Sequence, residues 1–307
     1  MVNLHKRSGA YSAHRRKPLR SLIFLAKTAL TAALWTYCAV SCNVDLFGFF
    51  ASSDLDNRLA SRNEFVLLDK ESVVLNAGGA PEYATIDVRN FSLPEEYVFI
   101  AVADTHIENG NLHGLDRLKN VLDGAKFVVV LGDITQNGKR DDIAAFVNFA
   151  LSLGIPCYPV LGNHDIYFDN WIVWKELIGS SSYKIDGGNT VMFILDSANG
   201  MFGGMQLDWL RKGLNGAKRH AFVFTHTNLF VSSVFDGVQI TDNRERAKMV
   251  SLLKGRAEMM LMGHVHKTII RKTAGVEYIS VNDFRKGKTI LRVYVSPSGI
   301  QYNFMNL

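Results

Sequence analysis

The chain has 307 residues, 48% of them hydrophobic, and a formal net charge of +5 at pH 7. This length and apolar content suffice to bury the core of one large domain or two small ones, which excludes a disordered protein. The charge would suggest a nucleic-acid-binding protein, but seven of the 34 basic residues lie within residues 1–42, which contain no Asp or Glu. The other 27 basic residues nearly balance the 29 acidic ones, so the basic character belongs to the N-terminal segment.

The first segment, residues 1–41, is predicted to be a signal peptide or a membrane anchor. Its basic start precedes an apolar stretch, residues 21–42, that carries a single charge at Lys27. An apolar stretch of about 20 residues can be cleaved or retained. Ala39-Val40-Ser41 before Cys42 resembles the bacterial lipobox, a site cleaved before a cysteine that becomes lipidated. This resemblance implies a membrane-attached, extracytoplasmic lipoprotein, periplasmic or on the cell surface; a retained signal anchor and ordinary secretion are the alternatives.

The cysteine content constrains the part of the chain that follows this leader. Of the three cysteines, Cys38 and Cys42 belong to the apolar stretch and its end. Cys157 would therefore be alone in the mature domain, so no internal disulfide is available even at an extracytoplasmic address. We expect Cys157 to be a small buried hydrophobic residue.

Residues 42–96 are predicted to form a tether and an N-terminal extension. They show no strong hydrophobic period and no low-complexity tract. A helix near residues 54–62 and short strands after it are the local structures that this stretch favours.

A regular alternation begins at residue 97, and residues 97–307 are predicted to form the main domain. Segments of helical period, GLDRLKNVL, DDIAAFVNFALSL and QLDWLRKGL, separate short apolar runs rich in β-formers. This alternation indicates an α/β fold in which helices cover the sheets, and the tail at residues 288–304 is predicted to close a sheet edge as a hairpin. The apolar runs are VFIAV (98–102), KFVVVL (126–131), CYPVL (157–161), TVMFIL (190–195), AFVF (221–224) and EMMLM (258–262).

Polar side chains that can bind metals gather just past the ends of these apolar runs. In open α/β sheets, binding sites form outside the carboxyl ends of the strands. One histidine at a strand end is more often structural than functional, but five of the nine histidines occupy such places here, together with two aspartates. The candidates in chain order are Asp104, His106, Asp133, Asn163, His164, His226, His264 and His266.

The spacing of these candidates suits metal ions. Residues two apart on an extended chain share a side, so the pair Asp104 and His106, like the pair His264 and His266, can face one ion or two adjacent ions. Mixed oxygen and nitrogen donors suit Mn²⁺, Fe or Zn²⁺ more than Ca²⁺, and the number of donors favours two ions. Three glycines each precede a candidate, where a backbone without Cβ can come close: Gly132, Gly162 and Gly263.

Five short blocks in this region resemble the signature of a known family. DTH, GDITQNG, GNHD, FTH and GHVH, in this order within residues 97–285, are similar to the signature blocks of the calcineurin-like metallophosphoesterases. The resemblance implies an α/β fold with two stacked mixed sheets and helices on both outer faces, a four-layer α/β/β/α sandwich. It also implies a dimetal-dependent phosphoesterase that hydrolyses phosphate esters by a metal-bridging hydroxide.

The same resemblance assigns roles residue by residue. One metal would be held by Asp104, His106, Asp133 and His266, and the other by Asp133, Asn163, His226 and His264, which makes Asp133 the bridge. His164 would be the catalytic general acid that protonates the leaving oxygen. Asp165 has two open roles, to orient a neighbour or to cap its turn.

Three positions depart from the family's pattern. Many members have Asp at the place of Gln136, where it orients the acid histidine, and some phosphatases have Arg at the place of Asn137, where it holds phosphate. Neither residue is charged here, and the lack of Tyr at position 136 disfavours the purple acid phosphatase branch. Thr227 follows His226 where Pro is common, so we expect a changed loop and a retained ligand.

The blocks leave several functions open. GDITQNG and GNHD favour a small phosphodiester or a nucleotide-type substrate, but phosphomonoesterases and pyrophosphate-bond hydrolases share the fold and the metal centre. A non-catalytic surface lipoprotein that keeps the fold as a binding module is the alternative from another class. A nuclease is disfavoured because the mature chain is near neutral and has no basic stripe with interleaved aromatics, so no nucleic-acid partner is expected.

Overall fold

The computed structural model describes residues 55–60, 73–75, 85–88, 92–216, 219–230 and 239–307. The chain divides into two units, residues 1–44 and 45–307, and every described residue belongs to the second unit. The predicted signal peptide or anchor at residues 1–41 and the predicted lipidation site Cys42 lie outside the described residues. Within the described ranges, no helix combines the length and the apolar composition needed to cross a membrane.

The helices and strands follow one another as the alternation predicts. The helices, with η for a 3-10 helix, are α2 (Leu55–Ala60), η2 (Leu115–Val121), α3 (Arg140–Leu151), η3 (His164–Asp169), α4 (Trp171–Leu177), α5 (Gly204–Leu214), α6 (Asn243–Leu253) and α7 (Phe284–Gly287). The strands are β1 (Val73–Leu75), β2 (Thr85–Val88), β3 (Tyr97–Val102), β4 (Ala125–Leu131), β5 (Cys157–Val160), β6 (Tyr183–Asp186), β7 (Thr190–Ile194), β8 (His220–Phe224), β9 (Met259–Met262), β10 (Ile269–Thr273), β11 (Val276–Ser280), β12 (Thr289–Ser296) and β13 (Gly299–Asn306).

Two mixed sheets organise these strands. The eight-stranded sheet has the order β1-β2-β6-β7-β8-β9-β11-β10, and its central strands β7, β8, β9 and β11 are parallel. The five-stranded sheet has the order β13-β12-β3-β4-β5, in which β3, β4 and β5 are parallel. The C-terminal strands β12 and β13 pair antiparallel from Thr289↔Asn306 to Ser296↔Gly299, with β13 at the edge. The predicted hairpin at the sheet edge is confirmed.

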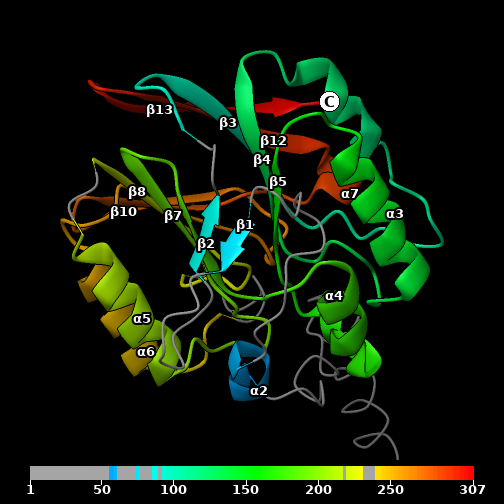
Figure 1. Cartoon of the computed structure of the whole chain (residues 1–307), viewed down its shortest axis with the longest axis horizontal. Coiled ribbons are helices and arrows are strands. Elements are labelled where there is room, and N and C mark those ends of the chain that lie inside the picture. The colour runs from blue at the N-terminus through cyan, green and yellow to red at the C-terminus, as the bar shows by residue number, and fades with distance from the viewer. Residues whose placement is uncertain (1–54, 61–72, 76–84, 89–91, 217–218, 231–238) are drawn as a thin grey trace, which may run out of the picture. The chain divides into compact units, whose positions relative to one another are not determined.

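The sheets stack face to face, and helices cover their outer faces. Between the sheets, the ring of Phe99 on β3 meets that of Phe222 on β8 edge-on, with centroids 5.3 Å apart, within one continuous apolar cluster. A second cluster joins the five-stranded sheet to η2, α3 and α4, and a third joins the eight-stranded sheet to α5 and α6. Figure 1 shows α5 and α6 on one side and α3 on the other. The predicted four-layer α/β/β/α arrangement is confirmed.

The burial of both sheet faces explains the apolar runs. A strand covered on one side by helices and on the other by a second sheet has no face for polar residues, and β4, β7 and β8 are buried along almost their whole length. Pro159 within β5 is tolerated because β5 lies at the edge of its sheet. Cys157 is buried, as predicted, and burial raises the pKa of its free thiol to about 12.

The helical segments take the faces that their periods predict, with one refinement. In α3, Ile143, Phe146 and Phe149 recur at helical spacing and are buried against the five-stranded sheet. The segment GLDRLKNVL forms the 3-10 helix η2 and not an α-helix. Its buried residues Leu115 and Leu118 are three apart, which matches the three residues per turn of a 3-10 helix.

The described parts of the N-terminal extension are built into this unit. The helix predicted near residues 54–62 is present as α2, and its Arg58 side chain forms a fully buried ion pair with Asp196 after β7. The strand β2 pairs in parallel with β6 of the eight-stranded sheet, where Thr85 is opposite Lys184. These contacts fix the described parts of the extension to the sheet whose strands lead into three of the seven candidate ligands, His226, His264 and His266.

Candidate metal centre

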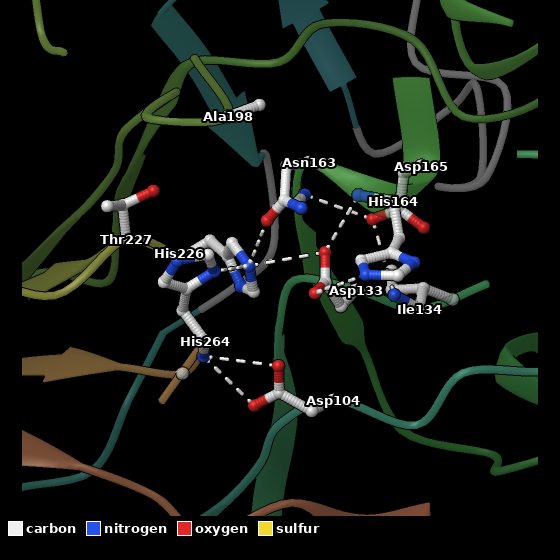
Figure 2. A network of polar contacts seen from close by, with 12 residues as sticks. Asp104, Asp133, Ile134, Asn163, His164, Asp165, Ala198, His226, Thr227 and His264 are labelled. Atoms are coloured by element: carbon white, nitrogen blue, oxygen red, sulfur yellow. Dashed lines mark hydrogen bonds and ion pairs between the residues drawn. The ribbon is translucent and has the colours of Figure 1, made fainter. Parts of the chain in front are cut away.

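The candidate ligands converge from both sheets. β3, β4 and β5 of the five-stranded sheet and β8 and β9 of the eight-stranded sheet all end at the same side, where the loops after them meet. Figure 2 shows the side chains from these loops facing one another around Asp133. Because sequence-distant strands end together, all seven predicted ligands belong to one polar cluster: Asp104, His106, Asp133, Asn163, His226, His264 and His266.

Asp133 lies at the centre of this cluster. One group of donor atoms comprises Asp104, His106, Asp133 and His266, and a second comprises Asp133, His226 and His264. Within each group all donor atoms lie within 4.8 Å of one another. Asp133 alone belongs to both, which is the arrangement that a carboxylate bridging two ions requires.

In the first group, imidazole nitrogens and carboxylate oxygens that can each bind a cation lie close together. Nε2 of His106 lies 3.3 Å from Nε2 of His266, and Nε2 of His266 lies 3.3 Å from Oδ1 of Asp104. Nε2 of His106 is 4.0 Å from Oδ2 of Asp133. Two imidazole nitrogens and two carboxylates thus surround one point, and mixed N and O donors of this kind suit Mn²⁺, Fe or Zn²⁺.

The second group gives the clearest test of whether a cation fits. Nδ1 of His226 lies 2.9 Å from the carbonyl oxygen of Leu131, and a carbonyl only accepts, so Nδ1 carries the proton. Nε2 is then the ring atom left to hold a cation, either a proton or a metal ion, and it faces Oδ1 of Asp133 at 3.2 Å and Oδ1 of Asn163 at 3.0 Å. Nδ1 of His264 lies 3.1 Å from the same Nε2. The atoms around Nε2 are acceptors that need a cation among them, and a metal ion meets that need as well as a proton does, so these residues fit a metal ion.

The electrostatics of the cluster agree with this fit. Burial alone would raise the pKa of Asp133, but His226, His164 and His106 together hold it well below the usual value. Burial would lower the pKa of His226, but the charge of Asp133 raises it to about 9. The position of His226 Nε2 thus favours a positive charge. Burial and the neighbouring His226 lower the pKa of His264 to about 3, which keeps its imidazole neutral and able to bind a metal.

The backbone that presents the ligands is strained. Five of the seven candidate ligands have positive φ, a conformation that is uncommon for residues other than Gly and costs about 1–3 kcal/mol each. Strain of this kind clusters at functional sites, where the surrounding structure enforces it. The five residues are Asp104 (φ 54°), His106 (φ 45°), Asp133 (φ 48°), His264 (φ 73°) and His266 (φ 50°).

All three predicted glycines allow the loops to approach, and a Cβ on Gly263 would lie 2.7 Å from the carbonyl oxygen of Leu131. A Cβ on Gly132 would lie 2.4 Å from Nδ1 of His226, and a Cβ on Gly162 would lie 2.1 Å from the backbone nitrogen of Asp133. Real Cβ atoms do not come this close to other heavy atoms. The prediction that these glycines serve close backbone approach is confirmed.

His164 lies beside the cluster without belonging to either group of donors. Its side chain is 18% exposed, and its Nε2 is 3.9 Å from Oδ2 of Asp133. Its Nδ1 lies 2.8 Å from the backbone carbonyl oxygen of Gln136, so Nδ1 donates and Nε2 is the atom that can gain or lose a proton. The backbone of Gln136 therefore orients His164, although its neutral side chain departs from the family's pattern.

Asp165 has a structural role in the turn. Its buried carboxylate accepts hydrogen bonds from the backbone nitrogens of Gly162 (3.0 Å), Ile134 (3.2 Å) and Thr135 (2.8 Å) and from Oγ1 of Thr135 (3.0 Å). Burial, with the charge of Asp133 second, raises the pKa of Asp165 to about 7, and the three backbone donors oppose this rise. Of its two predicted roles, capping the turn is the one these contacts support, because they tie the loop after β4 to the loop after β5.

The loop after His226 is held by hydrogen bonds to the loop after β7. The backbone nitrogen of Thr227 donates to Oγ of Ser197 at 2.8 Å, and Oγ1 of Thr227 donates to the carbonyl oxygen of Ser197 at 2.7 Å. Thr227 in place of the common Pro therefore supplies two hydrogen bonds that Pro could not make.

Two side chains at the site were not predicted from the sequence. Tyr167 accepts a hydrogen bond at its hydroxyl from Nδ2 of Asn163 at 3.0 Å, which turns Oδ1 of Asn163 toward the cluster. Arg285 lies past the end of β11 and donates to Oε1 of Gln136 at 2.6 Å. The rule that found the ligands, a polar residue just after an apolar run, would reach Arg285 only if it were extended to the fifth residue past VEYIS (276–280).

Comparison with known proteins identifies the type of domain. Residues 97–268 match the family model described as calcineurin-like phosphoesterase. This match covers more than half of the chain and includes all seven candidate ligands and His164. No curated protein matches the chain.

Solved structures with little sequence identity share the fold. A dimetal phosphatase from Danio rerio has a TM-score of 0.53 and 14% identity, over 68% of this chain and 98% of that one. A purple acid phosphatase from yellow lupin seeds has a TM-score of 0.55 and 12% identity, over 69% of this chain and 51% of that one. GAP50, described as the anchor in the inner membrane complex of Plasmodium, has a TM-score of 0.52 and 13% identity, over 69% and 85% of the two chains.

Proposed function

The chain belongs to the calcineurin-like phosphoesterase family, and from this premise we propose that it is a two-metal hydrolase of a small phosphodiester or nucleotide-type substrate. The observation that carries the proposal is the pair of donor groups that share Asp133. Such a pair suits two ions a few ångströms apart, which is the arrangement used for in-line displacement at phosphorus.

The residues of the chain have distinct parts in this reaction. We assign Asp104, His106, Asp133 and His266 to one ion, and Asp133, Asn163, His226 and His264 to the other. The ions, when bound, supply polarisation of the phosphoryl group and activation of the attacking water. Asn163 contributes a neutral ligand, so the site keeps enough positive charge for an anionic substrate.

His164 supplies the proton that the leaving oxygen needs. Its Nδ1–H is held by the carbonyl oxygen of Gln136, so a proton on Nε2 faces the site. Its partial exposure allows Nε2 to regain a proton from solvent after each turnover. General acid catalysis of this kind contributes about 10²–10⁴ in rate.

The function is tested by a panel of esters. The full-length protein, purified in detergent and loaded with Mn²⁺, is assayed on p-nitrophenyl phosphate, bis-p-nitrophenyl phosphate, cyclic AMP and a nucleotide diphosphate sugar. We expect two equivalents of metal and the highest kcat/KM on a diester or nucleotide substrate. A preference for p-nitrophenyl phosphate would make it a phosphomonoesterase, and a preference for the diphosphate sugar would make it a pyrophosphate-bond hydrolase.

A binding protein of the same fold is the competing function. GAP50 is described as an anchor and has a similar fold, so likeness of fold does not by itself establish catalysis. Two equivalents of bound metal without turnover of any ester in the panel would favour the binding protein. The complete set of donor atoms around Asp133 favours the enzyme.

We further propose that the enzyme is held outside the cytoplasmic membrane by a lipid on Cys42. The proposal is supported by the basic and apolar leader and by Ala39-Val40-Ser41 before the cysteine. A diacyl group provides two chains, which suffice for a stable anchor. Mass spectrometry of the native N-terminus is the test: a lipidated Cys42 is expected, and an intact leader starting at Met1 or Val2 would show a retained signal anchor instead.

A further inference from the structure

Arg285 is anchored beside the first group of metal ligands. It is the second residue of α7, whose preceding residue Asp283 bridges to Ala103 at the end of β3. The backbone nitrogen of Arg285 donates to the carbonyl oxygen of Asp104 at 3.2 Å. The main chain of Arg285 is therefore in direct contact with a candidate ligand.

Two acceptors fix the guanidinium group of Arg285. Nη1 donates to Oε1 of Gln136 at 2.6 Å, and Nη2 donates to Oε2 of Glu108 at 3.2 Å. The loops that carry these acceptors are themselves joined, because the backbone nitrogen of Gln136 donates to the carbonyl oxygen of Ile107 at 2.9 Å. The guanidinium group is oriented, and the Arg285 side chain remains 32% exposed.

The positive charge of Arg285 is only partly compensated by these acceptors. Glu108 carries a charge, but Gln136 is a neutral amide, and the Glu108 side chain is 37% exposed to solvent. Gln136 connects Arg285 to the general acid. Its side chain accepts the hydrogen bond from Arg285, and its backbone carbonyl oxygen accepts the hydrogen bond from Nδ1 of His164.

We propose that Arg285 is a substrate-binding residue that donates a charge-assisted hydrogen bond to a phosphate oxygen of the substrate. The proposal deepens the phosphoesterase function and rests on it. The guanidinium contacts Gln136, the residue that positions the general acid, and the main chain of Arg285 contacts Asp104. A planar, always-charged group with several donors matches the geometry of phosphate oxygens. Arg285 thus provides a cation near the centre, where the loop GDITQNG itself has a neutral Gln136 and Asn137.

The binding of inorganic phosphate to the Mn²⁺-loaded full-length protein tests this role without any turnover. Calorimetry compares wild type with Arg285→Gln, and elemental analysis checks the metal content of each variant. Because a hydrogen bond between charged groups is lost, we expect Kd for phosphate to rise about 10–100-fold with metal content unchanged. Arg219→Gln is the matched control: it removes the same charge from the position just before β8, at the opposite end of the sheet, and leaves Kd unchanged.

A second variant separates phosphate binding from a purely structural role. Glu108→Gln removes the carboxylate that competes for Arg285, so direct binding predicts that phosphate binds at least as tightly as to wild type. If Arg285 serves only to hold the loops together, Glu108→Gln and Arg285→Gln weaken phosphate binding alike, and the proposal is wrong. An unchanged Kd in Arg285→Gln also overturns it.

The outcomes distinguish this proposal from the phosphoesterase function. If wild type hydrolyses esters but Arg285→Gln binds phosphate as wild type does, only the role of Arg285 fails. If no ester is hydrolysed but phosphate binding weakens in Arg285→Gln and not in Glu108→Gln, Arg285 binds phosphate in a protein that is not an enzyme.

Discussion

The buried ion pair between α2 and the loop after β7 gives the most quantitative prediction for stability. Nε and Nη2 of Arg58 donate to Oδ2 and Oδ1 of Asp196 at 2.7 Å and 2.9 Å, and both side chains are 0% exposed. Arg58→Met keeps most of the side-chain length but leaves the carboxylate of Asp196 buried without its cation. The perturbation therefore leaves a buried charge without its ion-pair partner.

The expected loss is large relative to the stability of a domain. Removing one partner of a buried ion pair costs about 3–5 kcal/mol, because the remaining charge stays out of water. The free energy of unfolding of a typical domain is about 5–15 kcal/mol, so Arg58→Met removes a substantial fraction of it. At about 2–4 °C per kcal/mol for a large domain, Tm falls by about 6–20 °C.

Urea unfolding followed by tryptophan fluorescence measures this loss. The matched control is Arg140→Met, because the ion pair of Arg140 with Glu176 has side chains that are 53% and 50% exposed. An exposed ion pair contributes about 0–1 kcal/mol, so the control changes the free energy of unfolding little. A loss in Arg58→Met as small as that in Arg140→Met would refute the reasoning.

A double variant tests the cause of the loss. Asp196→Asn removes the buried charge but keeps an oxygen for the backbone nitrogen of Ala198, which donates to Oδ1 of Asp196 at 3.1 Å. Because no charge is then left unpaired, Arg58→Met combined with Asp196→Asn is expected to be more stable than Arg58→Met alone. If the losses of the two single variants simply add, the unpaired charge is not the cause.

Three further predictions concern the candidate centre. Asp133→Asn is expected to lose both ions, since Asp133 belongs to both donor groups, and two equivalents of metal remaining in elemental analysis would exclude the bridge. His164→Ala is expected to lower kcat about 10²-fold or more on alkyl or ribose esters and much less on p-nitrophenyl esters, whose leaving group needs no proton; equal losses would mean another acid. Gly162→Ala is expected to lower metal content and Tm because its Cβ would lie 2.3 Å from Oδ1 of Asp133, whereas Gly204→Ala, whose Cβ meets nothing within 4 Å, leaves both unchanged; a similar result for the two variants would contradict the close approach.

The apolar runs and the helical segments that separate them determined the fold class. Each apolar run of four to six residues became a strand because a strand buried on both faces requires largely uninterrupted apolar residues, as β4 and β7 show. β6, β10 and β11 were not predicted, because β6 alternates buried and half-buried residues over only four positions, β10 has three exposed ones and β11 is interrupted by the charged Glu277. Short strands of this kind are defined by their neighbours in the sheet, here β7 and β11, rather than by their own pattern.

The sequence by itself determined which residues could bind metal, because DTH, GDITQNG, GNHD, FTH and GHVH each place a polar side chain just past an apolar run. Only the tertiary structure decided how these residues meet. Asp133 is shared by both groups because the loop after β4 meets the loop after β3 of its own sheet and the loop after β8 of the other sheet, and the positive φ of its backbone depends on contacts with loops far away in the chain. The same holds for Arg285 and Gln136, 149 residues apart, and for Arg58 and Asp196, 138 residues apart. A local sequence pattern indicates whether a segment is buried. The partner of a side chain that lies more than a hundred residues away in the sequence is fixed only when the sheets have stacked and the strand ends lie together.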